Sequence, residues 1–400
     1  MFRTTLDDLA CLECRGTLSV VGSGSDAAQV AEGDLATDIF WGEVSCARCG
    51  AGYPILAGVL LYVRDIETTL IRHMKGITAL VPDEKIPELH RGVYQEARES
   101  LAQDGFFDEG IEEDLESERV NALYVMNHFL KAADVPVSSS EVINQLIADH
   151  WDHGPLEKTA DWIRNRFSQG GGRVIEFGSS VGGLPQRLPD LSRYLGIDGS
   201  FTSVALARHL VLGAHYPRQV RIPGDLISGP VSLAAKLPAP AWRSGSNQGV
   251  VDFIFADACE LAVKPESFDV SVALGLIDML DDPEKLIRAQ RQVIHETGAV
   301  VHASPYIWHE PVARALRERV FGQKSGSKVG NESQESSSNQ PLSSVSVVQA
   351  LYRNGGFCSV ESLDAMPWVF FKHLRQLEVY SVHWEALCPN PLHLADTHES

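Results

Sequence analysis

The sequence lacks an excess of positive charge. Its 400 residues hold 34 lysines and arginines against 53 aspartates and glutamates, which gives a formal net charge of −19. Proteins that bind nucleic acid without sequence preference need clustered Lys and Arg to neutralise phosphates. We therefore do not expect a nucleic acid to be the partner of this chain, although the composition still allows a local basic site.

Long apolar runs are missing as well. The start of the chain, Met1-Phe-Arg-Thr-Thr-Leu-Asp-Asp, has no apolar stretch of the kind that a secretory signal contains. The longest apolar run near it, Tyr53 to Val63, is too short to cross a bilayer. We expect a cytoplasmic protein without a membrane partner, and the sequence predicts no particular oligomeric state.

The cysteines do not suggest a disulfide framework, because there are seven of them and three are scattered. The other four form two Cys-x-x-Cys pairs, Cys11 with Cys14 and Cys46 with Cys49. Four thiolates in this spacing are typical of a tetrahedral Zn²⁺ site. Since four cysteine ligands leave no open position for chemistry, we expect this zinc to be structural.

Three parts can be distinguished along the chain. Residues 1–65 hold both cysteine pairs, and residues 66–168 alternate Glu-rich segments with apolar stripes, which predicts a helical lid over a substrate pocket. Residues 169–400 alternate strand and helix patterns, which predicts an α/β fold with a doubly wound parallel sheet. Within this third part, 217–249 and 322–345 are rich in Pro, Gly or Ser and are predicted to be mobile insertions.

The third part contains five candidate strands, two helices and two closing strands. We expect the five strands at 173–178, 193–198, 251–257, 268–275 and 298–304, helices at 283–296 and 346–356, and the closing strands at 358–371 and 378–387.

A glycine-rich turn follows the first of these strands, in Val174-Ile-Glu176-Phe-Gly178-Ser-Ser180-Val-Gly182-Gly183. Glycine tolerates positive φ and lets a ligand approach the backbone closely. Asp198 closes the second strand about 20 residues beyond Gly178, where a Rossmann-like fold places a carboxylate for ribose hydroxyls. The dinucleotide fingerprint G-x-G-x-x-G is absent, which disfavours a nicotinamide cofactor.

Together with Asp257-Ala258 after the third strand and Ser-Phe268-Asp at the entry to the fourth, this pattern resembles the class I S-adenosylmethionine-dependent methyltransferases. The resemblance implies a Rossmann-like fold with S-adenosylmethionine as its cofactor. Its cofactor residues here would be Glu176 at the methionine end, the turn Gly178, Ser180 and Gly182, with Ser180 in place of the family's middle glycine, Asp198 at the ribose, Asp257 and Ala258 at the adenine, and Leu274 and Gly275 along the pocket.

The first part resembles the small zinc-ribbon proteins that activate methyltransferases. The likeness is carried by Leu9-Ala-Cys-Leu-Glu-Cys-Arg-Gly-Thr-Leu and Cys-Ala-Arg-Cys-Gly-Ala-Gly-Tyr-Pro-Ile, with Leu12 where that family usually has proline. In that family the ribbon docks on the catalytic domain and stabilises it. The resemblance implies that a fused copy does so here, where it could also wall one side of the substrate pocket.

Methyl transfer requires chiefly alignment of the reactants, and a base only when the acceptor arrives protonated. Because the active sites of such sheets lie beyond the carboxyl ends of the strands, Asp278, His302 and Tyr306 are the candidate catalytic residues. His302 lies within an apolar strand and could equally be a core residue. In the helical part, the group Tyr124, Asn127 and His128 is expected to pack in the core.

We expect the acceptor to be a small molecule or a peptide, within specialised metabolism. Two alternatives stay open: an RNA or protein methyltransferase with a fused zinc-ribbon activator, and a non-catalytic scaffold that keeps the fold. No Asn-Pro dipeptide follows the fourth strand, which disfavours methylation of the amino groups of bases or glutamine. The presence of Glu176, Asp198 and Asp257 disfavours the scaffold.

Overall fold

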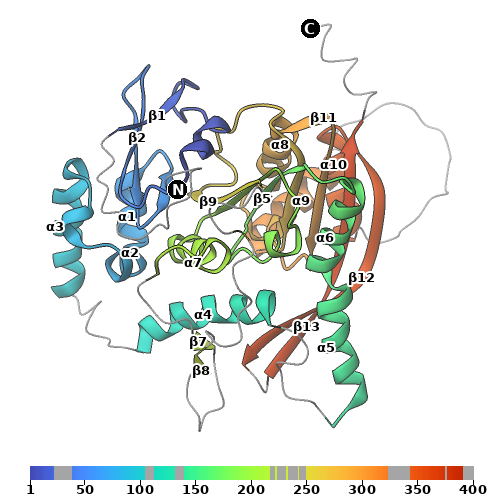
Figure 1. Cartoon of the computed structure of the whole chain (residues 1–400). Helices are drawn as coiled ribbons and strands as arrows, with labels where there is room; N and C mark the ends of the chain where they lie inside the picture. Colours follow the sequence, from blue (N-terminus) through green and yellow to red (C-terminus); the bar gives the residue numbers. More distant parts are fainter. Residues whose placement is uncertain are drawn as a thin grey trace, which may run out of the picture.

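The computed structural model describes residues 1–21, 38–103, 112–130, 139–216, 221–222, 231–232, 242, 249–322, 343–373 and 376–390. Most of the two predicted insertions therefore lies outside the described residues. The described strands form one eleven-stranded sheet and a separate two-stranded ribbon, β7 (Arg221–Ile222) with β8 (Val231–Ser232). Figure 1 shows the large sheet running through the molecule, with helices packed against it.

The third part of the chain supplies seven of these strands. They are β5 (Arg173–Phe177), β6 (Arg193–Asp198), β9 (Val250–Ala256), β10 (Phe268–Leu274), β11 (Ile294–Ser304), β12 (Phe357–His373) and β13 (Gln376–Pro389). Their spatial order is β9-β6-β5-β10-β11-β13-β12, with β13 antiparallel to both of its neighbours and the other pairs parallel. The order of the first five matches a dinucleotide-binding sheet, and it reverses between β5 and β10. A ligand crevice is therefore expected at the carboxyl ends of these two strands.

The predicted strands are confirmed in position, with one correction. The helix expected over 283–296 ends at Val293, and β11 already begins at Ile294. Ile294 is fully buried and pairs with Phe268, while a register shift separates this pair from the next one at Val270. Burial of the apolar Ile294 in the sheet thus extends the strand across the polar residues 295–297.

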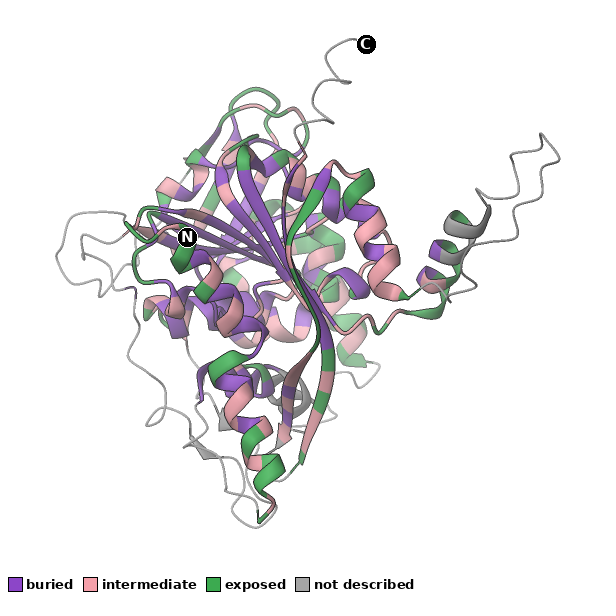
Figure 2. Cartoon of the chain, turned by 90° about the vertical axis from the view of Figure 1, so that its right-hand side faces the viewer, coloured by how far each residue is buried: buried purple, intermediate pink, exposed green. Residues whose placement is uncertain are grey.

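Helices cover the sheet on both faces, and Figure 2 shows the buried strands between them. One apolar core joins the sheet to α1 (Ile66–Arg72), α2 (Met74–Leu80), α3 (Glu88–Gln103), α4 (Glu112–Phe129), α5 (Glu141–His153), α6 (Pro155–Arg166) and α7 (Phe201–Leu212). The core of the other face joins it to α8 (Pro283–Val293), α9 (Glu310–Gly322) and α10 (Ser344–Asn354). None of the described helices has the length and apolar character that would let it span a bilayer.

The cysteine-containing part extends the same sheet. Its strands are β1 (Leu18–Val21), β2 (Gly42–Cys46), β3 (Gly52–Leu56) and β4 (Val59–Tyr62), and β4 pairs in parallel with β9. The N-terminal ammonium of Met1 is buried and donates to the carbonyl oxygens of Ile39 at 3.0 Å and Gly58 at 2.7 Å. The strand pairing fixes this part of the chain to the edge of the sheet, as does the Phe2 amide, which donates to Asp252 of β9 at 2.8 Å.

The hairpin of β12 and β13 runs well past the end of the sheet, toward α4 and α5 (Figure 1). Asn127 on α4 holds the backbone of Phe371 on β12 by accepting from its amide at 2.9 Å and donating to its carbonyl oxygen at 3.3 Å. Trp384 on β13 donates from its indole to Thr159 on α6 at 2.9 Å. These contacts hold the helices α4 to α6 and the hairpin together at the carboxyl ends of β5 and β10.

Candidate cofactor and acceptor site

The turn after β5 keeps the backbone open toward the carboxyl end of the sheet. Gly178 and Gly182 have φ of +75° and +79°, in the left-handed region that favours glycine. A Cβ on Gly182 would lie 2.8 Å from the ring of Phe253, so only glycine fits there. Ser180 also takes a left-handed φ, of +47°, a conformation that glycine adopts more easily than serine.

Asp198 lies at the end of β6, beside this turn. One carboxylate oxygen accepts from the amide of Ser180 at 2.9 Å and the other from the amide of Ser200 at 2.8 Å. Burial raises the pKa of Asp198, while these two amides oppose the shift by stabilising the charged form. Each oxygen keeps acceptor capacity for a ligand hydroxyl.

Glu176, the penultimate residue of β5, carries the second carboxyl group at this place. It is 4% exposed, and the hydroxyl of Tyr194 donates to it. Burial, with a smaller contribution from the nearby Asp198, raises the pKa of Glu176 to about 8. The carboxyl is therefore mostly protonated at neutral pH, and a cation placed beside it would draw the proton off.

Two cavities meet at these residues. Cavity 1, of about 480 Å³, has Gly178, Asp198, Asp257 and Ala258 in its wall. Cavity 2, of about 650 Å³, has Glu176, Gly178, Ser180, Asp198, Leu274 and Gly275 in its wall. The predicted cofactor residues other than Gly182 thus line two adjoining hollows at the switch point of the sheet.

The opposite wall of cavity 1 comes from the first part of the chain. Leu12, between the first two cysteines, and Arg64, after β4, both line it, together with Arg72 and His73 from α1 and its end. Residues 1–65 therefore contribute to the wall of cavity 1, which Asp257 also lines. Those of them that the structure describes contribute nothing to the lining of cavity 2.

The far side of cavity 2 is built by helix α4 and the long hairpin. Its apolar lining includes Leu156, Met279, Ile307, Trp368 and Phe370. Its polar lining beyond the cofactor residues includes Asn121, Tyr124, Asn127, His128, Asp278, Lys372 and Tyr380. The end of the Trp368 ring lies 3.5 Å from where a Cβ of Gly275 would be.

His128 was expected in the core, and it does pack tightly, but it also lines cavity 2. A Cβ on Gly183 would lie 2.8 Å from its Cβ, Cγ and Nδ1, so the ring rests directly on the glycine-rich turn. Burial, and then the charge of Arg187, lowers the pKa of His128 to about 3 and keeps the imidazole neutral. Nothing in the helical pattern of α4 could have shown this contact, because it joins distant parts of the chain.

The three candidate catalytic residues are placed differently. Asp278 lines cavity 2, but its two oxygens accept from the Ser304 hydroxyl and the Ile307 amide, both at 2.7 Å. His302 and Tyr306 line neither cavity. His302 instead stacks on Tyr352 of α10 with ring centroids 4.7 Å apart, on the other face of the sheet.

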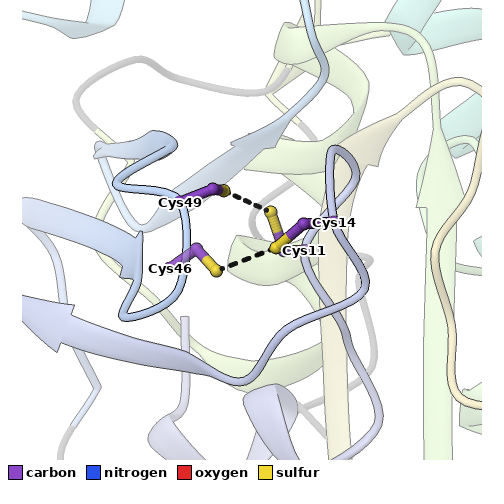
Figure 3. Close-up of side chains that lie close together, drawn as sticks. All are labelled: Cys11, Cys14, Cys46 and Cys49. Atoms are coloured by element: carbon purple, nitrogen blue, oxygen red, sulfur yellow. Dashed lines mark hydrogen bonds between the residues drawn. The ribbon is translucent and has the colours of Figure 1, made fainter.

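The four cysteines of the first part converge, as Figure 3 shows. The sulfurs of Cys11 and Cys49, and those of Cys14 and Cys46, are each 3.5 Å apart, and all four lie within 4.8 Å of one another. Sulfurs bound at about 2.3 Å to one tetrahedral Zn²⁺ would be separated by nearly the same distance. The donor set and its spacing therefore fit zinc.

One family of known proteins matches part of this chain. The family model described as a methyltransferase domain matches residues 230–302, which include β9, β10, α8 and most of β11. A search of curated proteins gave no match.

Among solved structures, the magnesium protoporphyrin IX methyltransferase of Synechocystis PCC 6803, with bound SAH, has a TM-score of 0.36 at 10% identity, over 73% of this chain and 100% of that one. A complex of a methyltransferase activator with a methyltransferase from Haloferax volcanii has a TM-score of 0.32 at 13% identity, over 60% and 97%. A methyltransferase from Methanosarcina mazei reaches 0.34 at 14%, over 57% and 97%. The TM-scores and the sequence identities are low in all three cases. Over residues 230–302, the chain is similar to methyltransferase domains.

Proposed function

We propose that this protein is an S-adenosylmethionine-dependent methyltransferase that acts on a small-molecule or peptide acceptor. The observation that carries the proposal is the pair of carboxyl groups, Glu176 and Asp198, at the ends of β5 and β6, on either side of a left-handed glycine-rich turn. The pair faces the switch point of the sheet, where folds of this class bind their ligands.

The residues present fit this cofactor. Asp198 has free acceptor capacity for ribose hydroxyls, and Asp257 with Ala258 lies at the far end of cavity 1, which suits an adenine ring. Glu176 lies in cavity 2, where it can take the ammonium group of a methionine moiety. When bound, the cofactor supplies a methyl group on a sulfonium centre.

Cavity 2 would then receive the acceptor. Trp368, Phe370 and Met279 give it an apolar wall, and Lys372 gives it a single cationic side chain. Such a wall suits a small, largely apolar acceptor better than an open polyanion groove. The chain's own contribution is to hold the acceptor in line with the cofactor and to exclude water from the cavity.

Neither His128 nor Asp278 is well suited to take a proton from the acceptor. His128 lines cavity 2, but burial lowers its pKa to about 3, which makes the imidazole too weak a base near neutral pH, and its Nδ1 is buried. Both oxygens of Asp278 hold the chain after β11. We propose a structural role for Asp278, because it holds the backbone of Ile307, which also lines cavity 2.

Titration calorimetry with S-adenosylhomocysteine tests the proposal. The wild type should bind, and Asp198→Ala should bind at least tenfold more weakly, because the ribose hydroxyls and the turn lose a shared acceptor. Asp190→Ala is the matched control, since Asp190 is exposed and lines neither cavity. Absence of binding in the folded wild type would instead favour the scaffold alternative.

A further inference from the structure

Behind the sheet, away from both cavities, three potential metal ligands face one another. His302 on β11 pairs in register with Glu385 on β13, and His383 lies two residues earlier on the same face of β13. Their exposed fractions are 0%, 0% and 2%. One ligand atom from each lies within 4.8 Å of the other two.

Polar atoms of this cluster are buried without partners. Three of these atoms have no hydrogen-bond partner among the described residues: the two ring nitrogens of His302 and the Oε2 atom of Glu385. Oε1 of Glu385, in contrast, accepts from the Gln349 amide at 3.1 Å. A buried carboxylate oxygen without a hydrogen bond is costly, typically by several kcal/mol for a charged group, and a cation bound between these atoms would offset that cost.

The spacing is that of a coordination site. Nε2 of His302 and Oε2 of Glu385 are 3.4 Å apart. Two ligands at about 2.0–2.1 Å from one tetrahedral ion are separated by roughly this distance. The atoms are too far apart for a good hydrogen bond, and they are well placed to share an ion.

The surroundings orient the ligands as metal sites require. The ring nitrogens of His383 lie 2.8 Å from the Tyr306 hydroxyl and 2.9 Å from the Ser362 hydroxyl. When one of these hydroxyls rotates away, the ring nitrogen that it leaves can bind an ion. The other nitrogen keeps its hydrogen bond, which is the usual arrangement for a ligating histidine. Gln349 does the same for Glu385 through Oε1. Ser362 is exposed on the edge strand β12, which gives an ion a short way in.

We propose that His302, His383 and Glu385 form a second metal site, separate from the four cysteines, which binds a divalent transition ion through two imidazoles and one carboxylate. Zn²⁺ suits this ligand set. Because the ligands are buried, the ion would be structural. It would tie β13 to β11 and so hold the hairpin whose β12 strand carries Trp368 and Phe370 into cavity 2.

Metal analysis of the purified full chain, after incubation with Zn²⁺ and desalting, tests the proposal. We expect two equivalents of zinc in the wild type, and one equivalent in Glu385→Gln and in His383→Gln. His309→Gln should keep two, because His309 is exposed and outside the cluster. Retention of one equivalent by a variant without the four cysteines would support the second site, and one equivalent in the wild type would overturn it.

Titration with Co²⁺ keeps the test decisive if the buried variants fail to fold. One equivalent should give the strong near-ultraviolet thiolate bands of a cysteine site, and a further equivalent should add only the weak visible bands of nitrogen and oxygen ligands. A titration that saturates after the thiolate bands alone would show that the cluster is a plain buried ion pair. Neither result depends on binding of S-adenosylhomocysteine.

Discussion

Arg64 donates a 2.7 Å hydrogen bond to the carbonyl oxygen of Leu12, the residue that follows the first of the four clustered cysteines. Both residues line cavity 1, which Asp198 closes on the other side. The module also holds the loop after Asp257, because the Ala10 amide donates to the carbonyl oxygen of Ala262 at 2.8 Å. The cysteine site and the proposed cofactor site therefore share a wall.

Loss of the ion from the four cysteines should weaken cofactor binding. We expect Cys11→Ser combined with Cys14→Ser to lower the affinity for S-adenosylhomocysteine roughly tenfold, about 1.4 kcal/mol, because Leu12 loses its fixed place in cavity 1. Calorimetry measures the change. Cys358→Ser, at an exposed thiol that lines neither cavity, is the control and should bind as the wild type does.

The same linkage must act in reverse. A ligand that binds the zinc-loaded form more tightly must, by reciprocity, make the ion harder to remove. S-adenosylhomocysteine should therefore stabilise the cysteine-bound zinc against a chelator in the wild type. Equal zinc affinity with and without saturating ligand would contradict the shared wall.

Glu176 should release a proton when the cofactor binds. Burial raises the pKa of Glu176 to about 8, so at pH 7 its carboxyl is mostly protonated. An ammonium group beside it favours the carboxylate and lowers that pKa, so binding expels a proton and affinity rises as the pH increases toward 8. Calorimetry in two buffers with different ionisation enthalpies detects the proton, and Glu176→Gln should release none. Identical binding enthalpies in both buffers would contradict this role.

Ser180→Gly should leave the site intact and relieve strain. The left-handed φ of Ser180 costs a non-glycine residue about 1–2 kcal/mol. Glycine avoids this cost, but it lowers stability by roughly 0.5–1 kcal/mol because it makes the unfolded chain more flexible. The free energy of unfolding should therefore rise by up to about 1.5 kcal/mol, and the amide that Asp198 accepts from is kept. Urea unfolding and calorimetry measure both. Ser180→Val, which is β-branched, should lose stability and affinity, and equal behaviour of the two variants would argue against strain at this turn.

Sequence reasoning recovered the sheet well, because its central strands are short, almost continuously buried apolar runs that turn residues separate. It also named Glu176 and Asp198, since the turn after a strand fixes where the next carboxyl falls. It could not place His302. Period-two alternation shows that His302 points away from its neighbours Val301 and Ala303, but which face of β11 meets the cavity depends on helices packed from elsewhere in the chain.

The role of helix α4 was hidden for the same reason. Its spacing indicates a packed face, but the partner of that face, the turn at Gly183, lies far away along the chain. Only the strand order brings the hairpin and α4 together over cavity 2.

We expect the contact between His128 and Gly183 to hold α4 in its place over cavity 2. A Cβ on Gly183 would lie 2.8 Å from the Cβ, Cγ and Nδ1 atoms of His128, close to the helix backbone, so Gly183→Ala must push α4 away. We expect a loss of about 1–3 kcal/mol in the free energy of unfolding, as overpacking usually causes, together with faster amide exchange in residues 121–130. Gly92→Ala, on an exposed turn of α3 with no atom near its would-be Cβ, should be neutral or slightly stabilising.

The double variant His128→Ala with Gly183→Ala separates this contact from a general defect in the turn. Removing the imidazole frees the space that the new methyl group needs, so the two changes should be strongly non-additive, with a coupling energy of at least about 1 kcal/mol. Slow amide exchange in α4 should return with it. If the two losses simply add, the strain of Gly183→Ala lies in the turn itself, and α4 is held over cavity 2 by other contacts, among them its hydrogen bonds to Phe371.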